Sequence, residues 1–350
     1  MKKLIYLLII FAIMLTSGCT KTTNTAEPSP KTASLEEKVG QMFFVRCDDA
    51  NIDTILSKNP AGLVMFAVDF KGLTKEEVQK KILSYQKKSK TPLIIAVDEE
   101  GGTVVRVSSN PNLSDEKYKS PQEYYLDGGM EKIKENTAEK SELLTSLGIN
   151  MNLAPVSDVS TNNEDFIYDR SFGKDAVATA EYVSSVVSVM KKNGIASCLK
   201  HFPGYGNNAD THTGIAIDER GYTEFEEKDF LPFKAGIDAG ADAVLVSHNI
   251  VNCMDSSVPA SISPAVHDIL RNTLGFNGII MTDDMSMDAM KDYGTPYVKA
   301  VNAGNDLIIV TDFDAAYNEV LNAVKSGEIE ESTIDKAVNR VTEWKEKNLK

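Results

Sequence analysis

The sequence is poor in histidine, cysteine and tryptophan, with 4, 4 and 1 of these residues among 350. Apart from Cys19 the cysteines are three and widely spaced, without a Cys-x-x-Cys, so neither a disulfide framework nor a zinc site is predicted. Positive charge is also scarce, since 37 Lys and Arg stand against 51 Asp and Glu, for a net charge of −14. This balance argues against nucleic acid as a partner and against electrostatic adhesion to anionic lipid.

The chain also lacks a hydrophobic run long enough to span a bilayer comfortably. Its N-terminal apolar segment, residues 4–15, follows two lysines and ends in Leu15-Thr16-Ser17-Gly18-Cys19, which resembles a bacterial lipobox. We therefore predict a lipoprotein signal peptide over residues 1–19, lipidation at Cys19, and a protein anchored by lipid to the cell membrane. A plain signal peptide and an uncleaved anchor helix are the alternatives. All three place the rest of the chain outside the cytoplasm.

Residues 20–33 are rich in Thr, Ser, Pro, Lys and Ala and are predicted to form a flexible tether. No second low-complexity stretch follows, so residues 34–350 are expected to form one domain. Eight short apolar runs alternate there with helical segments. The runs cover residues 41–47, 61–68, 92–98, 149–156, 196–201, 243–248, 278–283 and 306–311.

Continuous apolar strands that are each followed by a helix predict a parallel sheet covered on both sides. Eight such units predict an α/β fold, a single (β/α)8 barrel of the TIM type. A doubly wound open sheet is the alternative, but no Gly-x-Gly-x-x-Gly follows the first strand.

Helical segments are expected before, between and after these runs. They cover residues 75–88, 131–147, 176–192, 224–239, 264–274, 315–325 and 333–347. Ser34-Leu35-Glu36-Glu37 fits a capping box and opens a short helix before the first strand. The last helix is expected to close the domain.

Polar side chains gather where the predicted strands end, and in a barrel of this kind the functional groups lie at the carboxyl ends of the strands. The residues at these ends are Asp98, Asp158, Lys200, His201, His248, Asp283 and Asp284. The run Lys200 to Gly206 is followed at once by Asp210-Thr211-His212. The spacing of Asp210 and His212 lets a carboxylate orient an imidazole within one loop, which predicts a general acid/base.

Asp283 ends a buried strand, where a rigid and partly desolvated carboxylate suits a nucleophile or an electrostatic stabiliser. Asp284 is expected to point the other way and to serve as a helix N-cap. Asp98 precedes two glycines and is placed to accept hydrogen bonds from sugar hydroxyls or to bind a metal. Arg106 and Arg170 are candidates for binding a ligand.

From these residues alone, two classes of enzyme remain open. The first transfers a glycosyl group to water, with Asp283 as nucleophile and His212 as acid/base. The second is a metal-dependent barrel hydrolase using His201, His248 and an aspartate, but the first strand carries no His-x-His and Lys200 would repel a cation. A sugar-binding lipoprotein is a third possibility, although such proteins are generally two-lobed.

The ordered motifs resemble those of glycoside hydrolase family 3, in its single-domain bacterial β-N-acetylglucosaminidase branch. The resemblance runs from Ser34 to the last helix, over nearly the whole mature chain. The matching segments are Ser34–Phe43, Asp98–Gly102 with Arg106, Arg170–Gly173, Lys200–Gly206, Asp210–His212 and Thr282–Met287. The Asp-x-His after the Lys-His-Phe-Pro-Gly run separates this branch from the β-glucosidases of the family.

The resemblance implies that Asp283 is the nucleophile, His212 the acid/base and Asp210 its partner. The residues implied to hold the terminal sugar are Asp98, Arg106, Arg170, Lys200, His201 and His248. Two positions depart from the family's pattern, Tyr205 where many members have a second histidine and Thr103 where many have a basic residue. These departures concern the leaving-group side of the substrate.

The activity implied by the resemblance is exo-acting, retaining hydrolysis of β-N-acetylglucosaminides through a covalent glycosyl–aspartate intermediate. The implied substrates are carbohydrates, either cell-wall peptidoglycan fragments or chitooligosaccharides, and neither a metal nor an organic cofactor is implied. Phosphorolysis by the same residues and a β-glucosidase activity are the alternatives within the family.

Overall fold

The computed structural model describes residues 33–208, 210–211 and 214–349. The predicted signal peptide, the lipidation site Cys19, nearly all of the tether, and His212 therefore lie outside the described residues. No helix in the described ranges is long and apolar enough to cross a membrane.

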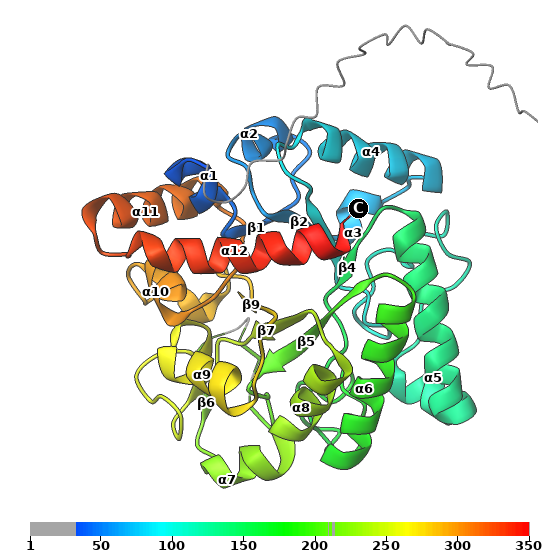
Figure 1. The fold of residues 1–350 in the computed structure, drawn as a ribbon. Helices are drawn as coiled ribbons and strands as arrows, with labels where there is room; N and C mark the ends of the chain where they lie inside the picture. Colours follow the sequence, from blue (N-terminus) through cyan, green and yellow to red (C-terminus); the bar gives the residue numbers. More distant parts are fainter. Residues whose placement is uncertain (1–32, 209, 212–213, 350) are drawn as a thin grey trace, which may run out of the picture.

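Eight parallel strands form the centre of the molecule (Figure 1). They are β1 (Phe43–Arg46), β2 (Gly62–Met65), β3 (Ile94–Val97), β4 (Met151–Asn152), β5 (Ala196–Phe202), β7 (Ala243–Val246), β9 (Ile279–Thr282) and β10 (Ile308–Val310). Each falls within or overlaps one of the eight predicted runs. The order is β10-β1-β2-β3-β4-β5-β7-β9, and a bridge between Met281 and Leu307 joins the two outer strands. The sheet is thus a nearly closed barrel, and the predicted (β/α)8 fold is confirmed.

Side chains alternate between the inside of the barrel and the layer beneath the helices, as the two-residue period of a strand requires. In β1, Phe44 packs in the inner cluster, whereas Phe43 and Val45 pack in the outer one. The inner cluster contains side chains from all eight strands, among them Val64 of β2 and Ala96 of β3. The barrel interior is therefore a packed apolar core rather than a pore.

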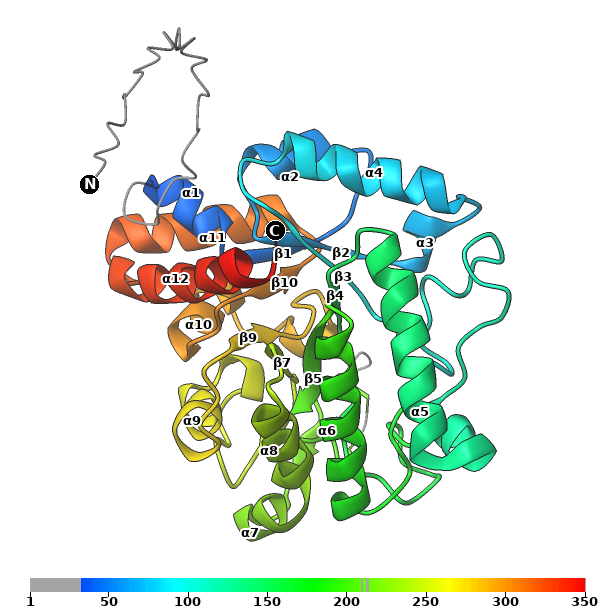
Figure 2. The same ribbon diagram turned by 45° about the vertical axis from the view of Figure 1, so that its right-hand side comes forward.

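Twelve helices in the described residues surround the barrel (Figures 1 and 2). They are α1 (Leu35–Gly40), α2 (Ile52–Ser57), α3 (Ala67–Phe70), α4 (Lys75–Lys88), α5 (Pro121–Ser146), α6 (Ala176–Lys192), α7 (Tyr222–Glu224), α8 (Phe230–Ala239), α9 (Pro264–Asp268), α10 (Pro296–Ala303), α11 (Phe313–Ser326) and α12 (Glu331–Asn348). The capping box at Ser34 and the exact span of α4 are confirmed.

Helix α5 departs most from its predicted length. It begins at Pro121, ten residues before the predicted start, because Ser120 and Glu123 form a capping box with proline in the first turn. Gly128 and Gly129 interrupt it with non-helical dihedral angles. The two glycines interrupt the helical periodicity, so the first part of the helix was not predicted, although its N-cap is present in the sequence.

Helix α12 closes the amino-terminal end of the barrel, as expected for the last helix. Val341 belongs to the inner apolar cluster, and Trp344 packs against it. The indole Nε1 of Trp344 donates to Asp242, just before β7, over 2.9 Å. Figure 1 shows α12 lying across β1 and β2. One end of the barrel is therefore sealed, which leaves the other for a ligand.

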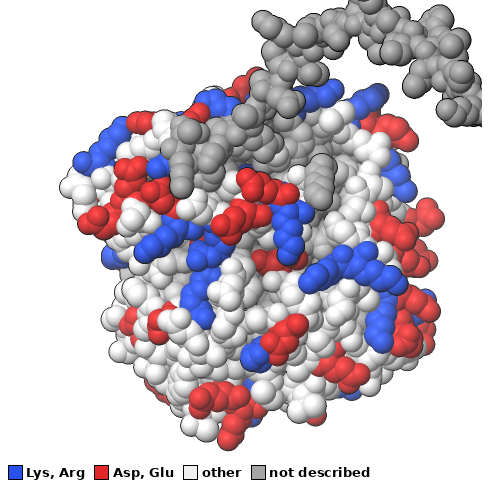
Figure 3. Space-filling view, viewed as in Figure 1, with Lys and Arg blue, Asp and Glu red and all other residues white. Residues whose placement is uncertain are grey.

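The negative charge of the chain is spread over the surface. On the face seen in Figure 3, Lys and Arg side chains are interspersed with Asp and Glu. Exposed ion pairs occur among the described residues, such as Lys234 with Asp238 at 2.5 Å and Lys88 with Asp53 at 2.7 Å. Such pairs contribute little to stability.

Candidate active site

An open cleft of about 660 Å³ lies at the carboxyl ends of the strands. It is lined by Val64, Phe66, Asp98, Val104, Arg106, Leu153, Phe166, Arg170, Lys200, His201, Asp210, Leu245, Asp283, Asp284, Ser286, Met287, Asp288 and Ile309. Seven of the residues predicted from the sequence to act on a ligand are among them. The fold thus brings together side chains that are up to 185 positions apart, counting from Asp98 to Asp283.

Lys200 stands at the end of β5 between two carboxylates. Its Nζ lies 2.5 Å from Asp98 and 2.6 Å from Glu100, and its side chain is only 2 % exposed. Burial alone would lower the pKa of Lys200, but Asp98 and Glu100 outweigh it and hold the pKa above its ordinary value. The lysine is therefore a fixed positive charge that holds the carboxylate of Asp98 in place at the cleft wall.

Glu100 also receives Arg170. The guanidinium donates to both carboxylate oxygens, through Nε at 3.0 Å and Nη2 at 2.7 Å. Burial would raise the pKa of Glu100, but Lys200 and Arg170 together hold that pKa well below its usual range. Glu100 is thus the buried anchor on which two cleft-lining cations are fixed.

His201 is held in one tautomer by its neighbours. Its Nδ1 lies 2.8 Å from a carboxylate oxygen of Asp158, while its Nε2 lies 3.2 Å from Nη2 of Arg170. A carboxylate only accepts and a guanidinium only donates, so the ring carries its proton on Nδ1 and accepts at Nε2. Asp158 also accepts from the backbone N–H of His201 and of Tyr205. The imidazole is accordingly a rigid, neutral part of the cleft wall.

Arg106 is presented by a loop that Glu99 folds. The buried carboxylate of Glu99 accepts from the backbone N–H of Arg106 at 2.6 Å and of Val107 at 2.7 Å. The guanidinium of Arg106 lies 5.7 Å from the ring of Phe66, and its Nε is buried without a hydrogen-bond partner among the described residues. A ligand hydroxyl in the cleft can satisfy this donor.

Asp283 follows β9 directly and lines the cleft, as predicted. Its backbone N–H donates to Val246 of the neighbouring strand, and one carboxylate oxygen accepts from the N–H of Asp284 at 2.8 Å. The position is therefore fixed by the sheet on one side and by its own turn on the other. This is the geometry that a nucleophile needs, because the carboxylate does not have to be ordered when the substrate arrives.

Two predictions about the neighbours of Asp283 are wrong. Asp284 is not a helix N-cap but lines the cleft, where its carboxylate accepts from the N–H of Ser286 in a turn. His248 does not line the cleft, because it is fully buried beneath it. Its Nδ1 lies 2.7 Å from the hydroxyl of Ser261 and its Nε2 3.0 Å from the carbonyl of Asp284. His248 thus supports the turn that carries Asp283.

Asp210 lines the cleft together with Asp283, which agrees with its predicted place. Its predicted partner, His212, lies outside the described residues. Thr211 between them is buried, and its hydroxyl lies 2.5 Å from that of Tyr205. Tyr205, one of the departures from the family pattern, therefore contacts the segment of the predicted dyad. Thr103, the other departure, is exposed and does not line the cleft.

Glu100, Phe66 and Phe166 were not predicted as site residues. Glu100 positions Lys200 and Arg170, and the two phenylalanines add aromatic rings to the cleft walls. Asp158 was predicted at a strand end, but its role in holding His201 was not. The sequence marks Glu100 only by its position two residues after Asp98. Among the described residues, no group of three or more His, Cys, Asp or Glu could hold a metal ion.

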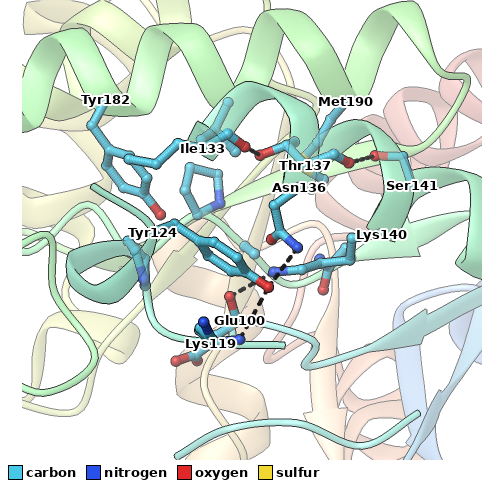
Figure 4. A pocket seen from close by; sticks show the side chains of 15 residues that line it. Glu100, Lys119, Tyr124, Ile133, Asn136, Thr137, Lys140, Ser141, Tyr182 and Met190 are labelled. Carbon is cyan, nitrogen blue, oxygen red and sulfur yellow. Dashed lines mark hydrogen bonds between the residues drawn. The ribbon is translucent and has the colours of Figure 1, made fainter. Parts of the chain in front are cut away.

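A second, smaller cavity lies behind Glu100, between α5 and α6 (Figure 4). Its volume is about 30 Å³, which is room for a water molecule. The Nζ of Lys140 points toward it and donates to the backbone carbonyl of Glu100 over 2.7 Å. Burial lowers the pKa of Lys140 to about 8, although Glu99 and Glu100 oppose the shift. Lys140 thus holds the backbone of Glu100 in place from the side facing away from the cleft.

The lowered pKa of Lys140 makes stability depend on pH in a defined direction. The unfolded chain, with an ordinary lysine pKa of 10.5, binds more protons than the folded protein between pH 8 and 10.5, so this group adds stability as pH rises. We expect the free energy of unfolding of wild type, relative to Lys140→Met, to increase by about 2 kcal/mol from pH 7.5 to 9.5. Urea titrations at both pH values measure it. Parallel pH profiles of the two proteins would contradict it.

Comparisons with known proteins agree with this geometry. The model of the glycosyl hydrolase family 3 N-terminal domain matches residues 34–344. A protein of Stenotrophomonas maltophilia named beta-hexosaminidase is 34% identical over 278 residues, which cover 76% of this chain and 80% of that protein.

Solved structures show the same similarity. A glycoside hydrolase family 3 beta-N-acetylglucosaminidase from Paenibacillus superposes with a TM-score of 0.84 at 29% identity, over 90% of this chain and 63% of that one. A beta-N-acetylhexosaminidase from Beutenbergia cavernae superposes with a TM-score of 0.80 at 25% identity, over 89% of this chain and 98% of that one. The chain thus spans less than two thirds of the Paenibacillus chain but nearly all of the Beutenbergia chain.

Proposed function

Since the chain belongs to glycosyl hydrolase family 3, as its motifs predicted, we propose that this glycosidase is an exo-acting, retaining β-N-acetylglucosaminidase. The observation that carries the proposal is the cleft itself, which the strand-end carboxylate Asp283 lines together with Asp98, Lys200, His201 and Arg170. The names of the relatives support the N-acetylated sugar as the substrate.

Several side chains of the cleft are suited to the hydroxyl groups of a sugar. Asp98 offers acceptor oxygens, Arg106 a donor without a partner among the described residues, and His201 a ring held in one orientation. The exo-acting mode of cleavage is what the family resemblance implies.

The reaction proceeds in two displacements. His212 protonates the leaving oxygen while the carboxylate of Asp283 attacks the anomeric carbon, which gives a glycosyl ester with inverted configuration. His212 then takes a proton from water, whose oxygen attacks the same carbon and releases Asp283, so that the original configuration returns. Asp210 holds the tautomer of His212 and stabilises the imidazolium.

The substrates fit a protein outside the cytoplasm. A lipid-anchored enzyme meets peptidoglycan fragments that end in N-acetylglucosamine, and chitooligosaccharides are the alternative source of the same sugar. The lipobox motif supports the anchor at Cys19 and the location at the cell membrane. Cys19→Ala should then move the protein from the membrane fraction to the soluble fraction, and an unchanged distribution would contradict the anchor.

Release of a chromogenic phenol tests the activity directly. Wild type should cleave the β-N-acetylglucosaminide and leave the β-glucoside essentially intact, and proton NMR should show the β-anomer as the first sugar product. Turnover of the glucoside alone, or an inverted product, would overturn the proposal. The same assay in the presence of phosphate tests for phosphorolysis. Formation of a sugar 1-phosphate would show that phosphate, rather than water, accepts the glycosyl group.

A further inference from the structure

A buried ion cluster lies at the root of the segment that carries Asp210. This segment leaves β5 at Pro203 and returns to the fold at β6 (Ile217–Asp218), which pairs with β8 (Ile250–Val251). Arg220, two residues later, reaches back to the beginning of the segment, where its Nη2 donates to the carbonyl of Gly204 over 3.2 Å. The two ends of the segment are thus joined by one side chain.

Arg220 is itself fixed on several sides. Its Nε and Nη2 donate to Asp218 at 3.0 and 2.7 Å, and its Nη1 donates to Asp229 at 2.8 Å. Both carboxylates are 1 % exposed, and the guanidinium lies 4.3 Å from the ring of Phe225. Asp229 directly precedes α8, so the arginine ties the segment to a helix that packs against β5.

The start of the segment is shaped to this cluster. Gly204 and Gly206 have φ angles of 124° and 56°, which favour glycine. A Cβ on Gly204 would lie 2.3 Å from Oδ1 of Asp229, and one on Gly206 would lie 2.5 Å from Cζ of Arg220. Asn208 adds a second link, because its Nδ2 donates to the carbonyl of Tyr205 at 2.7 Å and to Asp218 at 2.6 Å.

We propose that Arg220 is a positioning residue for the acid/base, joining Gly204 at the start of the Asp210-bearing segment to Asp218 at its end and both to Asp229. In this role it touches no reacting atom, and it acts by fixing the two ends of the segment that carries Asp210. This inference rests on the proposed function and deepens it. The cluster is separate from the wall that holds the sugar, since Arg220 does not line the cleft.

Substrates with different leaving groups distinguish a loss of acid catalysis from a general loss of folded enzyme. A poor leaving group needs protonation by the acid, whereas 2,4-dinitrophenolate leaves without it. We therefore expect Arg220→Lys, which keeps the charge but loses the forked contacts, to lower kcat/KM at least about tenfold for the 4-methylphenyl N-acetylglucosaminide. For the dinitrophenyl substrate the decrease should be below about threefold.

Arg271 offers a matched control at the other end of the barrel. It donates to the carbonyls of Phe276 and Gly278 and to Asp306, a carboxylate that is also 1 % exposed. Arg271→Lys disturbs a buried arginine–aspartate pair far from the predicted acid/base, where Asp306 also receives Arg340. It should change kcat/KM for the two substrates by the same factor.

His212→Ala serves as the reference for loss of the acid. Selective loss with the poor leaving group in both Arg220→Lys and His212→Ala supports the inference. An equal loss for both substrates in Arg220→Lys, with selective loss still seen in His212→Ala, overturns the inference alone. Failure of wild type to cleave either substrate overturns the proposed function, and the inference with it.

Discussion

Asp283→Ala should lower kcat/KM for the N-acetylglucosaminide by at least about 10⁴-fold, the largest loss we expect from one substitution. The carboxylate supplies the bond of the intermediate, and no neighbouring group has the same position, since Asp284 is held by Ser286 and Thr311. Initial rates with the purified variant measure the loss. Circular dichroism should show an unchanged fold, because the strand that carries Asp283 is hydrogen-bonded through its backbone.

A covalent trap identifies the same residue independently. A fluorinated, slowly hydrolysed N-acetylglucosaminide should leave its sugar on the peptide that contains Asp283, as found by mass spectrometry. Asp292→Ala, which removes an exposed carboxylate from the same loop region, should retain wild-type rates. Label on another residue would refute the assignment of the nucleophile.

Lys200→Met should be the second most damaging change, and it should act on stability as well as on activity. Removing the ammonium takes the lysine partner from Asp98 and leaves Glu100 with Arg170 as its cation, in a site where Glu100 is 3 % exposed. Breaking a buried ion pair in this way costs about 3 kcal/mol. Because Asp98 then loses its orientation as well, kcat/KM should decrease by roughly 10³-fold. Urea unfolding at pH 7 and initial rates measure the two effects.

A double variant separates these effects. Lys200→Met with Asp98→Asn removes the carboxylate that has lost its lysine partner, so the free energy of unfolding should return most of the way to wild type. Activity should stay low, because an amide cannot replace the carboxylate that accepts from the sugar. An unfolding free energy for Lys200→Met equal to that of wild type would show that the buried cluster is not under electrostatic control.

The strand ends were the part of the site that the sequence predicted well, and the reason is geometric. In a parallel barrel every strand end lies at the same rim, so a polar residue after an apolar run must lie near the others. Asp98, Lys200, His201 and Asp283 were all placed in this way, and the cleft contains each of them. Arg106 and Arg170 lie on loops, so strand ends did not point to them, and they were candidates first as isolated cations and then through the family resemblance.

What the sequence could not predict is which side chain pairs with which. Glu100 faces Lys200 and Arg170 across 100 and 70 positions, and no local pattern encodes such contacts. His248 ends a strand like His201 does, yet it lies beneath the cleft because Ser261 and the carbonyl of Asp284 engage its two nitrogens. A position at a strand end places a residue at the rim of the barrel, but it does not determine the direction in which the side chain points.

The position of α12 at the closed end of the barrel determines what the intrinsic tryptophan fluorescence of the protein reports. Trp344 is the chain's one tryptophan, and it sits on the sealed end, bonded to Asp242, whereas the cleft opens at the opposite end. Its emission is therefore an intrinsic probe of whether the last helix is docked. Binding of a sugar in the cleft should not change this emission. Unfolding can therefore be followed in the presence of ligand without a correction for quenching by the ligand.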